Sequence, residues 1–200
     1  DIAMLDSMFS MMLTVLGLRL YSDSAPVRVG SRHPVTYPVD AFEAKDGHVV
    51  MVVSSDRAFG AFCKAIGRPS LGEDERFRTN ADRNAHEGAL KAIIKAWTSE
   101  RNSAEIVAVM DAAGIPAAPV LSVAEIADSA HIASREMVST VEHPTLGDIP
   151  LVHQPVRFSG ADRQFQRPPP ALGEHTRELL ASLLGLGAEE IDALADEDVI

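Results

Sequence analysis

The sequence predicts a mixed α/β protein, in which a small α+β domain is joined to helices and linkers that belong to a larger domain. Three observations predict this class. The pair Asp46-Gly47 separates two apolar runs, as in a β-hairpin, and amphipathic helical patterns follow it. Later in the chain, the run Pro168 to Pro170 forms a stiff spacer before the last helices. A hairpin followed by helices favours a sheet covered by helices on one face.

The first element expected is an apolar helix over residues 6–20, preceded by the end of a strand at residues 1–5. Apolar side chains surround nearly the whole helix, which is typical of a helix buried against other protein. Its apolar run is shorter than the roughly 20 residues of a membrane span. Asp1 and Asp6 stand where a signal peptide has basic residues. A polar linker is expected over residues 21–29.

The loop over residues 30–38 reads Gly-Ser-Arg-His-Pro-Val-Thr-Tyr-Pro and shows no apolar periodicity. It leads into a hairpin over residues 39–53, where Asp46 and Gly47 are expected to adopt the positive φ angles of a tight turn. Two interpretations of the loop remain open. It presents polar groups to a ligand, or it is a connector that its prolines stiffen.

Three amphipathic helices are expected after the hairpin, over residues 56–66, 81–97 and 103–113, because apolar residues recur at helical spacing. A charged connector over residues 68–80 separates the first two. Serines are expected to cap the first and third helices, and glycines to end them; these residues are Ser54 or Ser55, Gly67, Ser103 and Gly114.

The last 85 or so residues alternate short strands and helices, as the spacing of apolar and turn residues indicates. We expect an extended segment at 116–120, a capping box at 122–125, strands at 137–142 and 149–153 with an extension at 157–159, a proline-rich spacer at 159–173, a helix that Thr176 caps, and a final acidic helix at 188–194.

Composition excludes several classes of function. The chain of 200 residues carries a formal net charge of −11, so nucleic acid and anionic membranes are not expected as partners. This composition favours a cytoplasmic protein. Cys63 is the single cysteine, which excludes an internal disulfide, and it is expected in the core. No motif for a nucleotide phosphate or a metal is present, so no metal site is expected.

The expected domain organisation has three parts. Residues 1–38 are a helix and linker of the larger domain, residues 39–158 are the small α+β domain, and residues 159–200 are a proline-rich linker with helices that return to the larger domain. The apolar helix before the hairpin and the triple proline after it motivate these boundaries.

Several short motifs share their order and spacing with one known family. They are G-S-R-H-P-x-x-x-P from Gly30, F-x-A-x-D-G-x-V-V from Phe42, the segment Asp74 to Asn80 with Arg83, the segment Ala113 to Val120, and the segment Pro169 to Thr176. Together they resemble the class III CoA-transferases of the CaiB/BaiF type, which include formyl-CoA transferase, carnitine CoA-transferase and α-methylacyl-CoA racemase. The resemblance corresponds to the C-terminal half of such an enzyme.

The resemblance implies a Rossmann-like larger domain supplied mostly by a missing N-terminal half, and a homodimer with interlocked chains. It also implies CoA transfer from an acyl-CoA to a small carboxylic acid through an aspartyl-CoA thioester. The nucleophilic aspartate lies upstream in the family, so no residue of this chain is expected to be catalytic. Coenzyme A is then a substrate, and no permanently bound cofactor is expected.

Gly30, Ser31, Arg32, His33 and Pro34 are the substrate-loop candidates. Family members resembling formyl-CoA transferase have a mobile loop with several glycines at this position, whereas this sequence has one. Arg32 and His33 are candidates to pair with an acceptor carboxylate.

Asp56, Arg76 and Arg83 are weaker candidates. Racemase members place a glutamate of the proton-transfer site near the position of Asp56, but an acidic residue at a helix start also stabilises the helix dipole. Arg76 and Arg83, with Arg78, form a cluster that either meets a CoA phosphate or is a solvated surface.

Two alternatives to the transferase remain. The first is an α-methylacyl-CoA racemase on the same scaffold. The second is a catalytically silent fragment or assembly subunit, because the nucleophile is not among these residues. The chain alone is predicted to be inactive.

Overall fold

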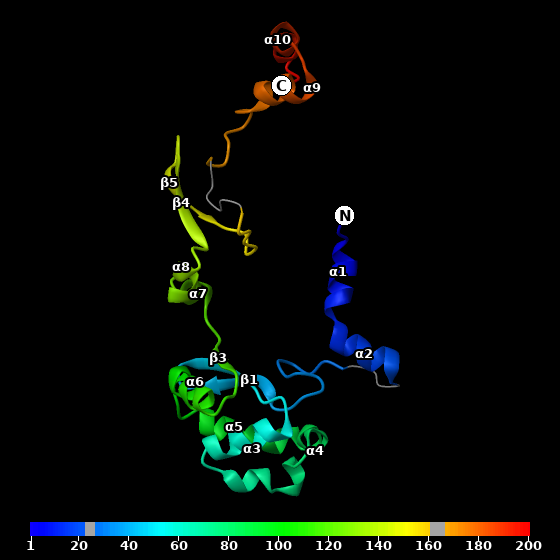
Figure 1. The fold of residues 1–200 in the computed structure, drawn as a ribbon, viewed down its shortest axis with the longest axis vertical. Coiled ribbons are helices and arrows are strands. Elements are labelled where there is room, and N and C mark those ends of the chain that lie inside the picture. Colours follow the sequence, from blue (N-terminus) through cyan, green and yellow to red (C-terminus); the bar gives the residue numbers. More distant parts are fainter. Residues whose placement is uncertain (23–26, 161–166) are drawn as a thin grey trace. The chain divides into compact units, whose positions relative to one another are not determined.

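The computed structural model describes residues 1–22, 27–160 and 167–200, and contacts within the chain group it into two units (Figure 1). The first unit is Asp1–Val120 and the second is Leu121–Ile200. Both combine helices with small antiparallel sheets, which agrees with the predicted α/β class. The predicted boundaries after residues 38 and 158, and the assignment of both ends to a larger domain, stay predictions.

A three-stranded antiparallel sheet organises the first unit, with β1 Val39–Ala44, β2 Gly47–Val52 and β3 Ala117–Pro119 in the order β1-β2-β3. The hairpin of β1 and β2 is therefore confirmed. Its turn differs in one detail. Gly47 has a φ of 150°, whereas Asp46 is not among the residues with positive φ. The Asp46 carboxylate instead accepts hydrogen bonds from the N–H and the hydroxyl of Ser103, which ties the turn to a helix start.

Three helices cover one face of this sheet. They are α3 Asp56–Ala65, α5 Glu87–Thr98 and α6 Ser103–Ala112; α5 packs on β1, and α6 packs on β2 and β3. The core between them consists of alternate strand residues and helical stripes, among them Phe42, Val49, Met51, Phe59, Phe62, Leu90, Ile94, Ile106 and Met110. Cys63 is buried there, as expected. Burial of these side chains drives the folding of the unit.

The helix predicted over residues 81–97 is two helices, α4 Asn80–Ala85 and α5, which meet at His86. His86 has φ −111° and ψ 27°, outside helical geometry, so the helix axis is interrupted there. A capping box of Thr79 and Asp82 starts α4. The connector before it contains two short 3-10 helices, η1 Pro69–Gly72 and η2 Glu75–Phe77.

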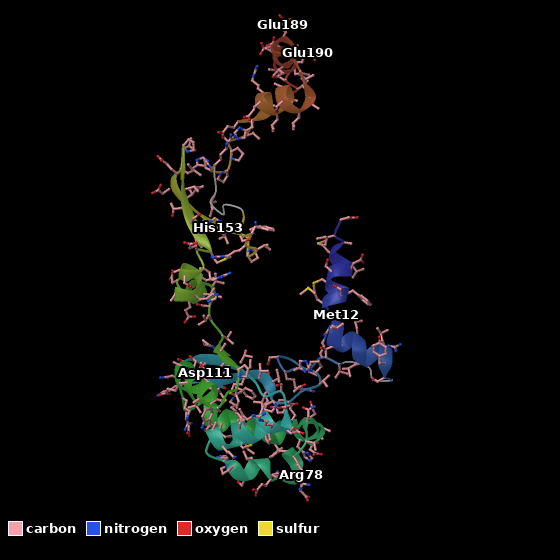
Figure 2. The ribbon with its side chains drawn as sticks, viewed as in Figure 1. Met12, Arg78, Asp111, His153, Glu189 and Glu190 are labelled. Carbon is pink, nitrogen blue, oxygen red and sulfur yellow. The ribbon has the colours of Figure 1, made fainter. Side chains whose placement is uncertain are left out.

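The N-terminal helix also breaks in two. The helices α1 Met4–Met11 and α2 Leu13–Tyr21 meet at Met12 with a bend of 74° (Figure 2). The expected strand end at residues 1–5 is wrong, because α1 already begins at Met4. Its apolar side chains are exposed in this chain; Met4 is 87% exposed and Phe9 55%. Among the described residues no single helix is long and apolar enough to cross a membrane, and only this bent pair reaches that length and composition together.

The second unit contains a two-stranded antiparallel sheet of β4 Val138–His143 and β5 Gly147–Val152, as the sequence predicts. The predicted capping box is present at the start of α7 Val123–Ala127, and a second short helix, α8 Ala130–Ser134, follows. The predicted strand extension at 157–159 is wrong, because these residues pair with no strand.

Two helices end the chain, α9 Thr176–Leu184 and α10 Ala188–Asp196. Thr176 is the first residue of α9 rather than its cap, which is His175. The predicted spacer at 159–173 lies partly outside the described residues. An ion pair of 2.5 Å between Arg177 and Asp192 links α9 to α10.

Candidate functional site

The loop over residues 30–38, hereafter the substrate loop, joins the N-terminal segment to β1. It starts at Gly30, whose φ of 70° lies in the left-handed region that favours glycine. The hydroxyl of Ser31 donates to Oδ1 of Asp40 on β1 at 2.6 Å. The N–H of His33 donates to the carbonyl of Val39 at 2.7 Å. The first half of the loop is therefore folded back on the strand that follows it.

Asp40 is a buried carboxylate that anchors this half of the loop. Besides Ser31, its oxygens accept hydrogen bonds from the N–H of Ala41 and from Nζ of Lys91 on α5, the latter at 2.7 Å. Burial by itself raises the pKa of a carboxyl group, but the hydrogen bonds from Lys91, Ser31 and Ala41 outweigh it and hold the pKa of Asp40 below its usual value. The side chain is thus ionised at neutral pH and paired.

Arg32 already has partners within the protein. Its Nη1 donates to the carbonyl of His33 at 3.3 Å and to Oδ1 of Asn84 at 3.4 Å, and its Nε lies 3.6 Å from a carboxylate oxygen of Glu87. The side chain is only 19% exposed. These contacts aim the guanidinium at α4 and α5, so an acceptor carboxylate would have to share it with Glu87.

Nδ1 of the His33 ring holds the loop, and Nε2 remains available to a ligand. Its Nδ1 accepts hydrogen bonds from the N–H groups of Val35 and Thr36, at 3.2 and 3.0 Å. Since Nδ1 is an acceptor, the neutral ring carries its proton on Nε2. Pro34 lies between these residues and donates no hydrogen bond, because proline has no N–H. The loop therefore holds a half-buried histidine whose Nε2–H is a donor.

The second half of the loop is held by α4. Asn80 accepts from the N–H of Tyr37 at 3.0 Å and donates to the carbonyl of Val35 at 2.8 Å. Asn84 donates to the same Val35 carbonyl at 2.9 Å, and Arg83 donates from Nε to the carbonyl of Tyr37 at 2.8 Å. Asn80 and Asn84 were not among the site residues predicted from the sequence. Their spacing of four residues behind a Thr-x-x-Asp capping box was the available signal.

Arg83 and Asp56, two of the weaker candidates, lie together. Nη2 of Arg83 donates to Oδ1 of Asp56 at 2.8 Å, and Nη1 donates to the carbonyl of Phe77 at 3.1 Å. The guanidinium also stacks 4.6 Å from the ring centre of Phe59 and is fully buried, while the side chain of Asp56 is 60% exposed. A fully buried guanidinium with these partners favours a structural role for Arg83 over a contact with a CoA phosphate.

Arg76 is separate from this group and lies at the surface. It forms two hydrogen bonds to the carboxylate of Asp74, at 3.0 and 2.7 Å, which lower the pKa of Asp74 to about 2. Its guanidinium also lies 5.0 Å from the ring centre of Phe77. Arg78 contacts Glu75 at 3.9 Å and is exposed (Figure 2). The structure therefore does not bring Arg76, Arg78 and Arg83 together as one cationic cluster.

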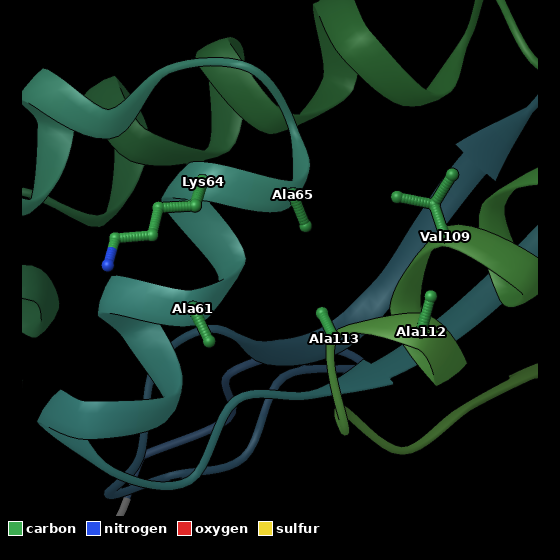
Figure 3. A pocket seen from close by; sticks show the side chains of 6 residues that line it. All are labelled: Ala61, Lys64, Ala65, Val109, Ala112 and Ala113. Carbon is green, nitrogen blue, oxygen red and sulfur yellow. The ribbon is translucent and has the colours of Figure 1, made fainter.

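A shallow apolar pocket of about 490 Å³ lies between α3 and α6 (Figure 3). It is lined by Ala61, Lys64, Ala65, Val109, Ala112 and Ala113, none of which belongs to the substrate loop. Among the described residues, no group of three or more His, Cys, Asp or Glu side chains is placed to hold a metal ion. The substrate loop with α4 is thus the candidate site, and it offers hydrogen-bond donors to a polar ligand.

Comparison with known proteins gives consistent results. The sequence profile of "CoA-transferase family III" matches residues 1–176. The acetyl-CoA:oxalate CoA-transferase of Acetobacter aceti is 35% identical, with 84% of this chain and 42% of that protein covered. The succinyl-CoA:glutarate CoA-transferase of Mus musculus is 30% identical, with 100% of this chain and 46% of that protein covered.

A solved structure is also similar, that of a CaiB/BaiF family protein from Brucella suis. It has a TM-score of 0.69 and 29% identity, with 89% of this chain and 46% of that chain covered. The chain spans about half the length of the curated relatives it matches. The profile covers most of the chain, and the folds agree. The chain therefore belongs to CoA-transferase family III.

Proposed function

We propose that this chain is the C-terminal portion of an acyl-CoA:carboxylate CoA-transferase, which moves CoA from an acyl-CoA donor to a small carboxylic acid. The observation that carries the proposal is the family match over residues 1–176, together with relatives named for CoA transfer to oxalate and glutarate. This chain covers less than half of those relatives. Because the resemblance implies an upstream nucleophile, we assign the remaining catalytic groups to an upstream segment.

The proposed chemistry is nucleophilic catalysis by an upstream aspartate. Its carboxylate attacks the thioester carbonyl of the donor, the C–S bond breaks, and a mixed anhydride and the CoA thiolate form. The thiolate then attacks the aspartyl carbonyl, which releases the donor acid and leaves an aspartyl-CoA thioester. The acceptor carboxylate reverses these two steps and departs as its CoA thioester. The aspartate is regenerated, and CoA acts as a substrate and not as a bound cofactor.

The substrate loop is the part of this chain that we assign to the active site. Negative charge develops on the thioester oxygen in each attack, and fixed hydrogen-bond donors stabilise such charge. The Nε2–H of His33 is a donor of this kind, because the two N–H groups bound to Nδ1 fix the ring. Ser31 and Arg32 already have partners in β1, α4 and α5, so their role is to hold the loop.

We also propose that the full-length protein is an interlocked homodimer in the cytoplasm. The exposed apolar side chains of α1 and α2 support the dimer, because contiguous apolar surface of this kind marks protein interfaces. The net charge of −11 supports a cytoplasmic location without a nucleic-acid or membrane partner.

The test is an assay of the full-length protein with acetyl-CoA and succinyl-CoA as donors and oxalate, glutarate and other dicarboxylates as acceptors. The expected result is formation of the acceptor's CoA thioester, measured by liquid chromatography. In the same reactions in D₂O, α-proton exchange without CoA transfer would instead identify a racemase. Absence of both activities would indicate a silent assembly subunit.

The chain of residues 1–200 alone is expected to show no CoA transfer above background. Incubation with labelled acyl-CoA and mass spectrometry of the intact chain measures this directly. A CoA thioester trapped on any residue of this chain would contradict the upstream position of the nucleophile.

A further inference from the structure

Every backbone N–H group of the substrate loop from His33 to Tyr37 donates a hydrogen bond. His33 donates to Val39, Val35 and Thr36 donate to the His33 ring, and Tyr37 donates to Asn80, while Pro34 has no N–H. Each N–H group in this stretch therefore has a partner. Opening the loop would break several of these hydrogen bonds together.

The side chains that bind the backbone of the second half of the loop all come from one short helix, α4. The residues Asn80, Arg83 and Asn84 of α4 bind the backbone of Val35 and Tyr37, which lie 43 to 49 residues earlier in the chain. Asn84 further accepts from Arg32. The first half of the loop, in contrast, is fixed by Asp40 and Lys91. The first half of the loop thus depends on β1 and α5, with one further contact from Arg32 to α4, and the second half depends on α4.

Arg83 fixes α4 itself. Its guanidinium binds the Phe77 carbonyl before the helix and Asp56 at the start of α3, and it is fully buried. A planar guanidinium can donate in several directions at fixed angles, which a lysine ammonium cannot do from the same position. The same side chain holds Tyr37, so α3, η2, α4 and the loop meet at one cation.

We propose that α4 is a clamp that preorganises the substrate loop, and that Arg83 is the positioning residue of this clamp. The loop is then a fixed element that presents Nε2 of His33 in one place, and it does not open and close during turnover. The expected effect on CoA transfer rests on the proposed function. The fixed conformation of the loop does not.

Hydrogen exchange measured by mass spectrometry on the full-length protein tests the clamp. In the wild type, the peptide over residues 33–38 is expected to exchange as slowly as the β1 and β2 hairpin. Asn84→Ala removes one of the two donors to Val35 and should speed exchange of this peptide about tenfold or more. Arg83→Met should do so more strongly. Asn84→Ala keeps the experiment decisive if Arg83→Met does not fold, because Asn84 does not bind Asp56 or Phe77.

The matched control is Arg76→Ala, which removes a surface cation of η2 that pairs with Asp74 and lies over the ring of Phe77. It should leave exchange of residues 33–38 unchanged. Fast exchange in the wild type, unchanged exchange in Asn84→Ala, or an equal increase in the control would each overturn the clamp.

Kinetic measurements test whether the contacts from α4 position the substrate loop for the reaction. With any acceptor that the wild type uses, Asn84→Ala should lower kcat/KM about tenfold, while the midpoint of urea unfolding stays close to that of the wild type. A loosened loop with unchanged kcat/KM would overturn the positioning role. If the wild type transfers no CoA at all, the proposed function fails, and exchange alone then decides whether the clamp exists.

Discussion

At the scale of single residues, the buried carboxylate of Asp40 is the group with the clearest pH dependence. Its pKa lies below the usual value in the folded chain, because three hydrogen bonds outweigh the effect of burial. A carboxyl with a lowered folded pKa stabilises the protein above its unfolded pKa of about 3.9, and the contribution is lost as pH falls through the folded pKa.

We therefore expect Asp40→Asn to lower the free energy of unfolding by about 1 to 3 kcal/mol at pH 7, since the charge opposite Lys91 is lost. Lys91 is partly exposed, so the lower end is expected. The difference from the wild type should shrink as pH falls below about 4, because the Asp40 carboxyl is protonated first in the unfolded chain and then, at its lower pKa, in the folded chain. Urea unfolding at pH 7 and pH 3 measures this. A difference that grows at low pH would contradict the lowered pKa.

The two ring nitrogens of His33 have different roles: Nδ1 holds the loop, and Nε2–H is the proposed donor to substrate. Two substitutions can test these roles separately. Asn places its side-chain oxygen near the position of Nδ1, while Gln places its amide near Nε2. His33→Asn should keep the loop conformation and the stability within about 0.5 kcal/mol of the wild type, but lower CoA transfer in the full-length enzyme. His33→Gln should lower stability by about 1 kcal/mol. Unfolding and transfer assays on both variants measure this pattern.

His143 provides the control for this pair. Its Nδ1 accepts from the N–H groups of Thr145 and Leu146, the same offsets of two and three residues as in His33-Pro34. His143→Asn should therefore affect neither stability nor transfer. If His33→Asn transfers CoA as fast as the wild type, Nε2 of His33 has no part in the reaction.

Tyr37 carries a buried hydroxyl that has no hydrogen-bond partner among the described residues. Burial, and to a lesser extent the nearby charges of Glu87 and Asp40, raise the pKa of this phenol, so it stays neutral. An unpaired buried hydroxyl costs stability, and Tyr37→Phe should leave the free energy of unfolding unchanged or raise it by about 1 kcal/mol. Urea unfolding at pH 7 measures it. A loss of more than about 1 kcal/mol would show that the hydroxyl is paired.

At the scale of elements, one glycine inside α3 and one just after its end are expected to respond to substitution in opposite directions. Gly60 lies inside α3, and a Cβ added there meets nothing within 4 Å. Gly67 follows the end of α3 with a φ of 72°. Both sites have space, so only the backbone conformation distinguishes them.

Gly60→Ala should therefore raise the free energy of unfolding by about 0.5 to 1 kcal/mol, because alanine loses less backbone freedom on folding. Gly67→Ala should lower it by about 1 to 2 kcal/mol, because a side chain disfavours the left-handed region. Paired urea titrations of the two variants give the comparison. If both substitutions change the free energy of unfolding in the same direction, the backbone conformation of Gly60 or Gly67 differs from the one described.

At the scale of the whole molecule, α1 and α2 carry a run of large apolar side chains that this chain leaves exposed. Their exposed large apolar side chains include Met4, Leu5, Met8, Phe9, Met11 and Leu13. Burying one such side chain contributes about 1.5 to 3 kcal/mol, so several together could stabilise an interface. We propose that a second copy or the upstream segment covers them in the full-length protein.

Sedimentation velocity of the full-length protein is expected to show a dimer at micromolar concentration. Phe9→Arg should shift it toward the monomer, because a charge is then placed in the apolar contact. Asp111→Asn is the control, since it makes the same change of net charge at an exposed position of α6 (Figure 2). A stable wild-type monomer would contradict the dimer, and an equal shift in the control would show a general effect of charge.

The sequence by itself determined the elements whose causes are local. Alternating apolar residues around Asp46-Gly47 predicted the β1 and β2 hairpin, and the spacing of Phe59, Phe62 and Cys63 predicted α3. Such patterns depend on residues a few positions apart, which is the range over which strand and helix periodicity act. The ordered motifs also predicted the family, which the profile match confirmed.

Only the tertiary structure decided what holds the candidate site. The pairing of Tyr37 with Asn80 and Arg83, and of Asp40 with Lys91, joins residues more than 40 positions apart. No local rule predicts such contacts, because they exist only after the sheet and helices have brought distant backbone and side chains within hydrogen-bond distance. Arg83 therefore read as a surface cation in the sequence, whereas packing around Phe59 and Asp56 makes it the buried centre of the clamp.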